Sequence, residues 1–283
     1  MGKKLLFVIV FLLLPLSGCG IVSIGYNYAD AYLRYSINSY ATFNGDQQAF
    51  INNEVDSFMR WHRKEMLPEY VSFLQDMHKT AQTGAALKQE EVARFRKEVR
   101  ALYVKTLQPT IKPAANLLSE IVPGQIDELV ESFQHENNKR KDKELGGSPE
   151  EQLRKRAERT IDFLENLVGG LSDKQLDSIR EMSHQLPYAT AIYIQLREDN
   201  QARLIELMIN KKGQEEIGDF LYTWLTAPES NRSAEEQATM LAFEQASDDM
   251  IIRIYAMLTE RQRKTLRGNI RKYLDTFNEL SKK

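Results

Sequence analysis

Apolar side chains recur along most of the chain at the spacing of an α-helix. Residues three or four positions apart share one face of a helix, whereas a half-buried strand alternates every second residue. From residue 26 onward no such alternation is sustained. The pattern therefore predicts an all-α protein, an irregular bundle of roughly eight to ten helices without a sheet. The clearest helical stripe consists of Leu266, Ile270, Tyr273, Leu274 and Phe277.

Several helix starts share a five-residue pattern: an apolar residue, a capping residue, two spacers and Gln. In such a capping box the cap side chain accepts a backbone N–H, and the Gln side chain reaches back to the cap. The pattern occupies residues 43–47, 171–175 and 258–262, and residues 121–125 keep the frame with Val at the cap. Ser148 and Ser233 begin two further starts, each with Glu three residues later.

Glycine and proline mark the helix ends that we expect. The expected breaks lie at Gly84, Pro109, Pro113, Gly146, Gly169, Gly213 and Pro228, and Pro68 and Pro187 are expected to kink or restart a helix. The polar stretch 137–147 is the best linker candidate. We therefore expect one helical domain over residues 19–283, with a flexible seam near 137–148.

The first eighteen residues are built like a secretory leader. Two lysines precede the apolar run Leu5 to Leu16, whose helical length of about 18 Å is too short for a bilayer core of about 30 Å. The sequence Leu16-Ser17-Gly18-Cys19 follows. It resembles the lipobox of bacterial lipoproteins. The resemblance implies that residues 1–18 are removed as a signal peptide, that the Cys19 thiol receives a diacylglycerol and that the new amino terminus is acylated.

The residue after the cysteine carries sorting information in Gram-negative lipoproteins. Here it is Gly20 and not Asp, which by resemblance implies the outer membrane, with the body in the periplasm. The lipid on Cys19 would make the membrane a partner, and we expect no other cofactor. The alternative is a secretory leader that carries a cysteine beside its cleavage site.

Composition narrows the function classes. A single Cys excludes a disulfide framework and multi-Cys metal sites, and a formal charge of −2 argues against nucleic-acid binding. Loss of residues 1–18 would leave a charge of −4, although the segment from Leu258 onward carries eight basic and three acidic residues. Lys264, Arg267 and Arg271 share one face there. We expect this face to meet anionic headgroups, lipid A or peptidoglycan, with a plain solvated surface as the alternative.

The densest group of chemically able residues is Trp61-His62-Arg63-Lys64-Glu65-Met66-Leu67-Pro68-Glu69-Tyr70. With residues 26–30 and 170–175, it resembles a proteobacterial family of helical lipoproteins of unknown function. That family often has Glu-Leu-Pro where this chain has one residue more, Glu65-Met66-Leu67-Pro68. The resemblance implies location and fold but no activity. It marks a motif of unknown role, made of Trp61, His62, Arg63, Glu65, Pro68 and Tyr70.

Two interpretations of this motif stay open. On a straight helix His62, Glu65 and Glu69 share a face, where they would bind a metal or move a proton. The alternative is that Trp61 anchors a core while the charged residues form surface pairs. Known catalytic signatures such as H-E-x-x-H, G-x-S-x-G and glycine-rich phosphate loops are missing from the sequence. We therefore expect no enzyme activity and no metal.

A weaker resemblance concerns two helix starts. Leu258-Thr259-x-x-Gln262 and Leu171-Ser172-x-x-Gln175 are similar to the LTxxQ motif of small periplasmic stress chaperones, although a capping box explains the same residues. The function that we expect is a lipid-anchored envelope protein with a non-catalytic helical body that binds or scaffolds envelope proteins. The alternative is a periplasmic chaperone or adaptor of the LTxxQ kind.

Overall fold

The computed structural model describes residues 19–283, and all regular structure in this range is helical. The predicted all-α class is confirmed. Residues 19–283 form twelve α-helices, more than the eight to ten expected, because the first helical stretch divides at Tyr28 and a π-helix separates α4 from α5. None of the described helices is long and apolar enough to cross a membrane. The predicted leader, residues 1–18, lies outside the described residues.

The helices follow one another along the chain with short connections. Their bounds are α2 Cys19–Asn27, α3 Ala29–Asn38, α4 Gly45–Trp61, the π-helix η1 His62–Met66, α5 Leu67–Gln82, α6 Gln89–Ser119, α7 Pro123–Leu145, α8 Pro149–Val168, α9 Asp173–Gln185, α10 Thr190–Ile209, α11 Gln214–Thr226, the 3-10 turn η2 Pro228–Asn231, α12 Ala234–Ala256 and α13 Glu260–Leu280.

The predicted helix starts are confirmed. At each of them a cap side chain accepts the backbone N–H of the third residue into the helix, which satisfies a donor that has no partner inside the helix. The five caps are Asn44, Ser148, Ser172, Ser233 and Thr259. At α7, where Val122 has no capping group, its backbone N–H still donates to the Gln125 side chain at 3.1 Å.

The breaks expected at Pro109 and Pro113 are wrong, because both prolines lie inside the unbroken α6. A proline inside a helix removes a hydrogen bond and costs about 3 kcal/mol. In α6 that cost is offset by packing, since Ile111 and Ala115 of the same stretch are buried against α7, α10 and α11. Tertiary burial therefore outweighs the local preference.

The seam expected near 137–148 is narrower in the structure than the polar sequence indicates. Helix α7 continues through most of it and ends at Leu145, so only residues 146–148 are not helical. Long-range ion pairs hold the charged end of α7, with Lys141 bonded to Glu198 at 2.7 Å and Glu144 to Arg159 at 3.1 Å. The alternating charges of this segment thus lie on a helix that faces solvent, where they form ion pairs with neighbouring helices.

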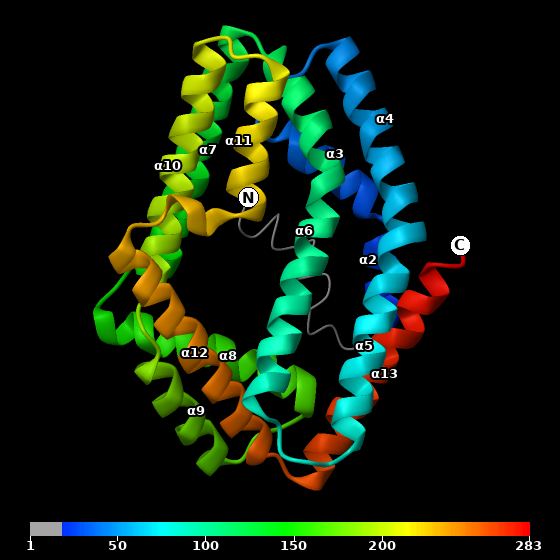
Figure 1. Cartoon of the computed structure of the whole chain (residues 1–283), viewed down its shortest axis with the longest axis vertical. Coiled ribbons are helices and arrows are strands. Elements are labelled where there is room, and N and C mark those ends of the chain that lie inside the picture. Colours follow the sequence, from blue (N-terminus) through cyan, green and yellow to red (C-terminus); the bar gives the residue numbers. More distant parts are fainter. Residues whose placement is uncertain (1–18) are drawn as a thin grey trace.

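The helices form two closed circuits that share α6, the long helix through the middle of Figure 1. One circuit runs from α6 through α12, α9, α8, α13 and α5 back to α6, each helix contacting the next. In the other, α6 contacts α11, α11 contacts α10 and α10 contacts α7. Hydrogen bonds between the starts of α7 and α4 close it, because α4 also contacts α6.

Many of the buried apolar side chains of the described residues form four clusters, of which the third and fourth share Leu171 and the first and fourth share Leu266. The first joins α2, η1, α5, α6 and α13, and the second joins the end of α6 to α7, α10 and α11. The third and fourth join α8, α9, α12 and the start of α13. Because each cluster is small, polar contacts between helix ends contribute to holding the circuits closed.

Candidate functional site

The motif between α4 and α5 contains the π-helix η1. Pro68 has no backbone N–H and so cannot bond the carbonyl four residues before it. In the turn before it the N–H of Leu67 bonds the carbonyl of His62, five residues back, which is the hydrogen bond of a π-helix. One residue is thereby absorbed without breaking the helix. Such π-bulges are frequent at functional sites.

His62 is the centre of a buried hydrogen-bonded chain. Its Nδ1 lies 3.0 Å from the Tyr26 hydroxyl, and its Nε2 lies 3.3 Å from the Tyr70 hydroxyl. The Tyr70 hydroxyl is 2.6 Å from Thr106 Oγ1, which donates to the carbonyl of Leu102 at 2.8 Å. The chain therefore joins α2, η1, α5 and α6.

The direction of each hydrogen bond follows from the inner end of the chain. Because Thr106 donates its proton to Leu102, its oxygen accepts from Tyr70, and the Tyr70 oxygen in turn accepts from His62 Nε2–H. The Tyr26 hydroxyl then donates to an unprotonated Nδ1. The network thus assigns His62 as the neutral Nε2–H tautomer.

Burial disfavours the charged form of the three ionisable side chains in this hydrogen-bonded chain, those of His62, Tyr70 and Tyr26. It lowers the pKa of His62 to about 4 and raises the pKa of Tyr70 to about 12. Burial also raises the pKa of Tyr26 to about 12, although the neighbouring Arg63 opposes that shift. At neutral pH the three side chains are uncharged, and the chain contributes positioning and stability.

The structure separates the three residues that the sequence places on one face. His62 is buried, whereas Glu65 and Glu69 are exposed, and Glu69 pairs with Lys105 at 2.7 Å. Trp61 packs against Phe58 and the first cluster, in accord with the core-anchor alternative. Within residues 19–283 no group of three or more His, Cys, Asp or Glu side chains is placed to hold a metal ion.

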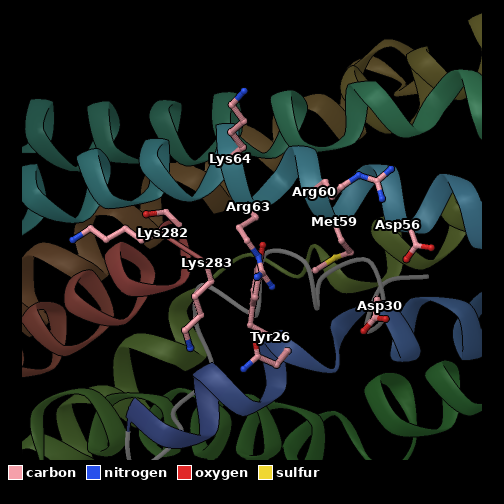
Figure 2. Close-up of a pocket in the computed structure, with 11 residues that line it drawn as sticks. Tyr26, Asp30, Asp56, Met59, Arg60, Arg63, Lys64, Lys282 and Lys283 are labelled. Carbon is pink, nitrogen blue, oxygen red and sulfur yellow. The ribbon is translucent and has the colours of Figure 1, made fainter.

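Beside the buried chain lies a surface pocket of about 540 Å³, shown in Figure 2. Tyr26 is common to both, since its ring lines the pocket while its hydroxyl holds His62. The guanidinium of Arg63 stacks over the Tyr26 ring at 5.4 Å from its centroid. The other residues that line the pocket are Asn27, Asp30, Asp56, Met59, Arg60, Lys64, Ser281, Lys282 and Lys283.

The pocket carries an excess of positive charge. Its two carboxylates share one arginine from α3, because Arg34 bonds Asp30 at 2.7 Å and Asp56 at 2.5 Å. The hydrogen bond from Arg34 also lowers the pKa of Asp30. Among the described residues, none of the five lining cations forms an ion pair with a carboxylate. These five are Arg60, Arg63, Lys64, Lys282 and Lys283.

The cationic face expected on α13 is largely occupied by intramolecular pairs. Arg267 bonds Glu260 at 2.7 Å, and Arg271 bonds Asp275 at 3.3 Å, while Lys264 is exposed. Sequence reasoning did not find the pocket, because its cations come from α4, from η1 and from the residues that follow α13. The sequence signals that bear on it are Arg63 in the motif and the two lysines at 282 and 283.

The glutamines of the four Gln-containing helix starts form two reciprocal pairs. The amides of Gln47 and Gln125 exchange hydrogen bonds of 3.2 and 2.7 Å, which join α4 to α7. Those of Gln175 and Gln262 exchange hydrogen bonds of 2.9 and 3.0 Å, which join α9 to α13. All four side chains are buried, and each circuit of helices contains one pair. We call these pairs the glutamine clasps.

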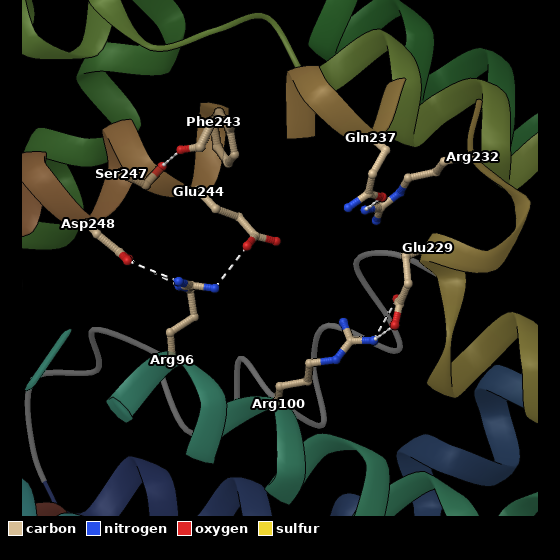
Figure 3. A network of polar contacts seen from close by, with 9 residues as sticks. All are labelled: Arg96, Arg100, Glu229, Arg232, Gln237, Phe243, Glu244, Ser247 and Asp248. Atoms are coloured by element: carbon tan, nitrogen blue, oxygen red, sulfur yellow. Dashed lines mark hydrogen bonds and ion pairs between the residues drawn. The ribbon is translucent and has the colours of Figure 1, made fainter. Parts of the chain in front are cut away.

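A second polar contact joins the first half of α6 to α12, as Figure 3 shows. Arg96 bonds both oxygens of the buried Asp248, at 3.2 and 3.1 Å, and also Glu244 at 2.8 Å. One turn further along α6, Arg100 bonds the exposed Glu229 of η2 at 2.6 Å. These contacts hold α6, the helix that carries Thr106 of the buried hydrogen-bonded chain, to α12 and to η2.

These features define an all-α protein whose helix starts are clasped in pairs and whose central motif forms a buried polar chain. The protein belongs to the DUF6279 family, a family of unknown function, whose model matches residues 39–236. The expectation of a family without known function is confirmed. The matched range contains His62, Tyr70 and Thr106 but not Tyr26 or α13. Comparison with curated proteins finds no match, and neither does comparison with solved structures.

Proposed function

We propose that the protein is a lipid-anchored bacterial envelope protein, held to the outer membrane of a Gram-negative cell through Cys19, whose helical body binds or scaffolds without catalysis. One observation carries this proposal. Helix α2 begins at Cys19, and Val22 and Tyr26 of the same helix are buried in the first cluster. A lipid on Cys19 would thus join the folded body directly, with no linker to separate them.

The short connection has a mechanical consequence. One helical turn separates Cys19 from Val22, a rise of about 5 Å. An anchored body would therefore lie against the bilayer with a restricted orientation. Such an arrangement suits a protein that presents a fixed surface at the membrane, and envelope proteins, lipid A and peptidoglycan are the partners within reach.

Metabolic labelling with an alkyne analogue of palmitate tests the anchor. The wild-type chain should incorporate the label and sediment with membranes, whereas Cys19→Ser should lose both properties. Gly18→Ala is the matched control, because it keeps a small residue beside the cysteine and should still be labelled. Label that persists in Cys19→Ser would overturn the proposal.

Sorting is tested separately by density-gradient fractionation of the two membranes. The wild-type chain should be found with the outer membrane. Gly20→Asp should shift it to the inner membrane if the sorting rule of Gram-negative lipoproteins applies. An inner-membrane position of the wild-type chain would refute this part of the proposal while leaving the anchor intact.

The chaperone alternative draws no support from the LTxxQ-like positions. Gln175 and Gln262 are buried in a clasp, so they are not exposed to contact a client. The exposed large apolar side chains lie on several different helices and include Tyr35, Tyr222 and Ile251. A holdase would suppress the aggregation of an unfolded protein at near-equimolar ratio. We expect this chain not to do so, and suppression would favour the alternative.

A further inference from the structure

The pocket beside Tyr26 is built from segments far apart in the sequence. Tyr26 belongs to α2, Asp56 to α4, Arg63 to η1 and Lys282 to the residues that follow α13. Figure 2 shows the Arg63 side chain extending toward Tyr26, with Lys282 and Lys283 at one side. A volume of about 540 Å³ lies within the range of small-ligand sites.

The charges of the pocket point to an anionic ligand. Five cations line the pocket against two carboxylates, and both carboxylates, Asp30 and Asp56, bond Arg34 and not a lining cation. Arginine binds phosphate oxygens with a planar fork of donors, and lysine supplies a mobile point charge. A phosphate group placed between Arg60, Arg63 and the lysines would find both kinds of donor.

The position of the pocket points to the source of that phosphate. Tyr26 and Asn27 are seven and eight residues after Cys19 on the same helix. Ile24 of α2, Tyr28 between the two helices and Tyr35 of α3 are exposed. Tyrosines with an apolar body and a polar tip favour the membrane–water interface. These exposed side chains lie on the same helical stretch that supplies Tyr26, Asn27 and Asp30 to the pocket.

We propose that the pocket binds the phosphate-bearing headgroup of an anionic phospholipid. The binding chemistry depends only on the lining residues, whereas the lipid as source rests on the proposed anchoring. The phosphate would be held by Arg60 and Arg63, with Lys282 and Lys283 closing the side toward the end of α13. Tyr26 would form the wall of the pocket, fixed from behind by its hydrogen bond to His62.

The test uses the purified full chain in nonionic detergent. Dihexanoyl phosphatidylglycerol is the probe, and isothermal titration calorimetry measures its affinity. We expect binding by the wild-type chain and by Cys19→Ser alike, so a failure of acylation and a failure of the pocket are distinguishable. Dihexanoyl phosphatidylcholine should not bind, and inorganic phosphate should bind about tenfold more weakly than phosphatidylglycerol.

Two matched pairs of substitutions locate the site. Arg60→Gln with Arg63→Gln should weaken phosphatidylglycerol binding about tenfold or more. Lys79→Gln with Lys174→Gln changes the net charge equally at two exposed positions outside the pocket, and should leave affinity unchanged. Lys282→Gln with Lys283→Gln removes two exposed cations after the last helix without disturbing helix packing, and should also weaken binding.

Three results would overturn the proposal. Unchanged affinity in both pocket variants would show that the ligand does not occupy the pocket. An equal loss in the pocket variants and in Lys79→Gln with Lys174→Gln would show attraction by overall charge. Inorganic phosphate that binds as tightly as phosphatidylglycerol would show that a free phosphate, and not a lipid headgroup, is the ligand.

Discussion

Protonation of His62 should destabilise the first cluster by a measurable amount. The folded protein holds the pKa of this histidine at about 4, whereas an unfolded chain has the ordinary value of about 6.5. Between these values the unfolded state binds a proton that the folded state does not, so acidification favours unfolding. At about 1.4 kcal/mol per pKa unit, the loss of stability between pH 7.5 and pH 4 amounts to about 3 kcal/mol.

The hydrogen-bonded chain explains why the proton is excluded. A proton on Nδ1 would face the Tyr26 hydroxyl, which donates to that atom at present, and Arg63 stands against the same tyrosine. The hydroxyl would have to turn away, and two positive charges would lie on either side of one ring. Desolvation of the buried imidazolium is the main cost.

Urea unfolding over a series of pH values measures the effect. Trp61 fluorescence is a local probe, because its ring centroid lies 6.4 Å from that of His62, and Trp224→Phe removes the second tryptophan. In that background His62→Gln keeps a neutral hydrogen-bonding side chain but does not titrate. The stability advantage of the wild-type residue should be full above pH 6.5 and fall by about 3 kcal/mol as pH approaches 4.

Carboxylates that titrate in the same window are common to both proteins and cancel in the difference. His135→Gln, at an exposed position of α7, is the control and should give a curve parallel to that of the wild-type protein. Parallel curves for His62→Gln and the wild-type protein would refute the reasoning. So would a wild-type advantage that grows toward low pH.

Two further contacts give sharp comparisons in the same unfolding assay. Gln175→Glu keeps the cap but loses the N–H₂ group of the clasp, so it should lower the free energy of unfolding by about 2–3 kcal/mol. Glu236→Gln, in an exposed capping box, should change it by at most about 0.5 kcal/mol. Equal losses would contradict the role of the clasp. Arg96→Met leaves buried Asp248 without its partner and should lower the free energy of unfolding by about 3–5 kcal/mol. Arg100→Met removes an exposed pair and should lower it by at most about 1 kcal/mol. Similar losses in the two variants would contradict this ranking.

Local sequence signals sufficed for the fold class and for the helix starts. Helical spacing of apolar residues and capping boxes act over three or four residues, and both are visible without knowledge of the tertiary structure. The same signals did not reveal the glutamine clasps. Gln47 and Gln125 each complete a cap of their own helix, but each amide N–H₂ group reaches the other's amide oxygen only because α4 and α7 start side by side.

Proline was the misleading local signal. At Pro68 the sequence correctly indicates a restart, and α5 begins one residue earlier. At Pro109 and Pro113 the same rule fails because α6 is held from outside, by the second cluster along one face. The difference lies in burial, which depends on the segments that pack against the helix and not on the residues next to the proline.

The π-helix explains why the face predicted for His62 was wrong. At about 100° per residue, a straight helix places Glu69 about 20° from His62, and Tyr70 about 80° away. One residue absorbed by η1 shifts every later position back by about 100°, so Tyr70 falls within about 20° of His62 and Glu69 turns to the surface. Arguments from helical spacing therefore hold on either side of His62–Met66 but not across it. For this reason a histidine that the sequence pairs with carboxylates lies in a chain of hydroxyl groups.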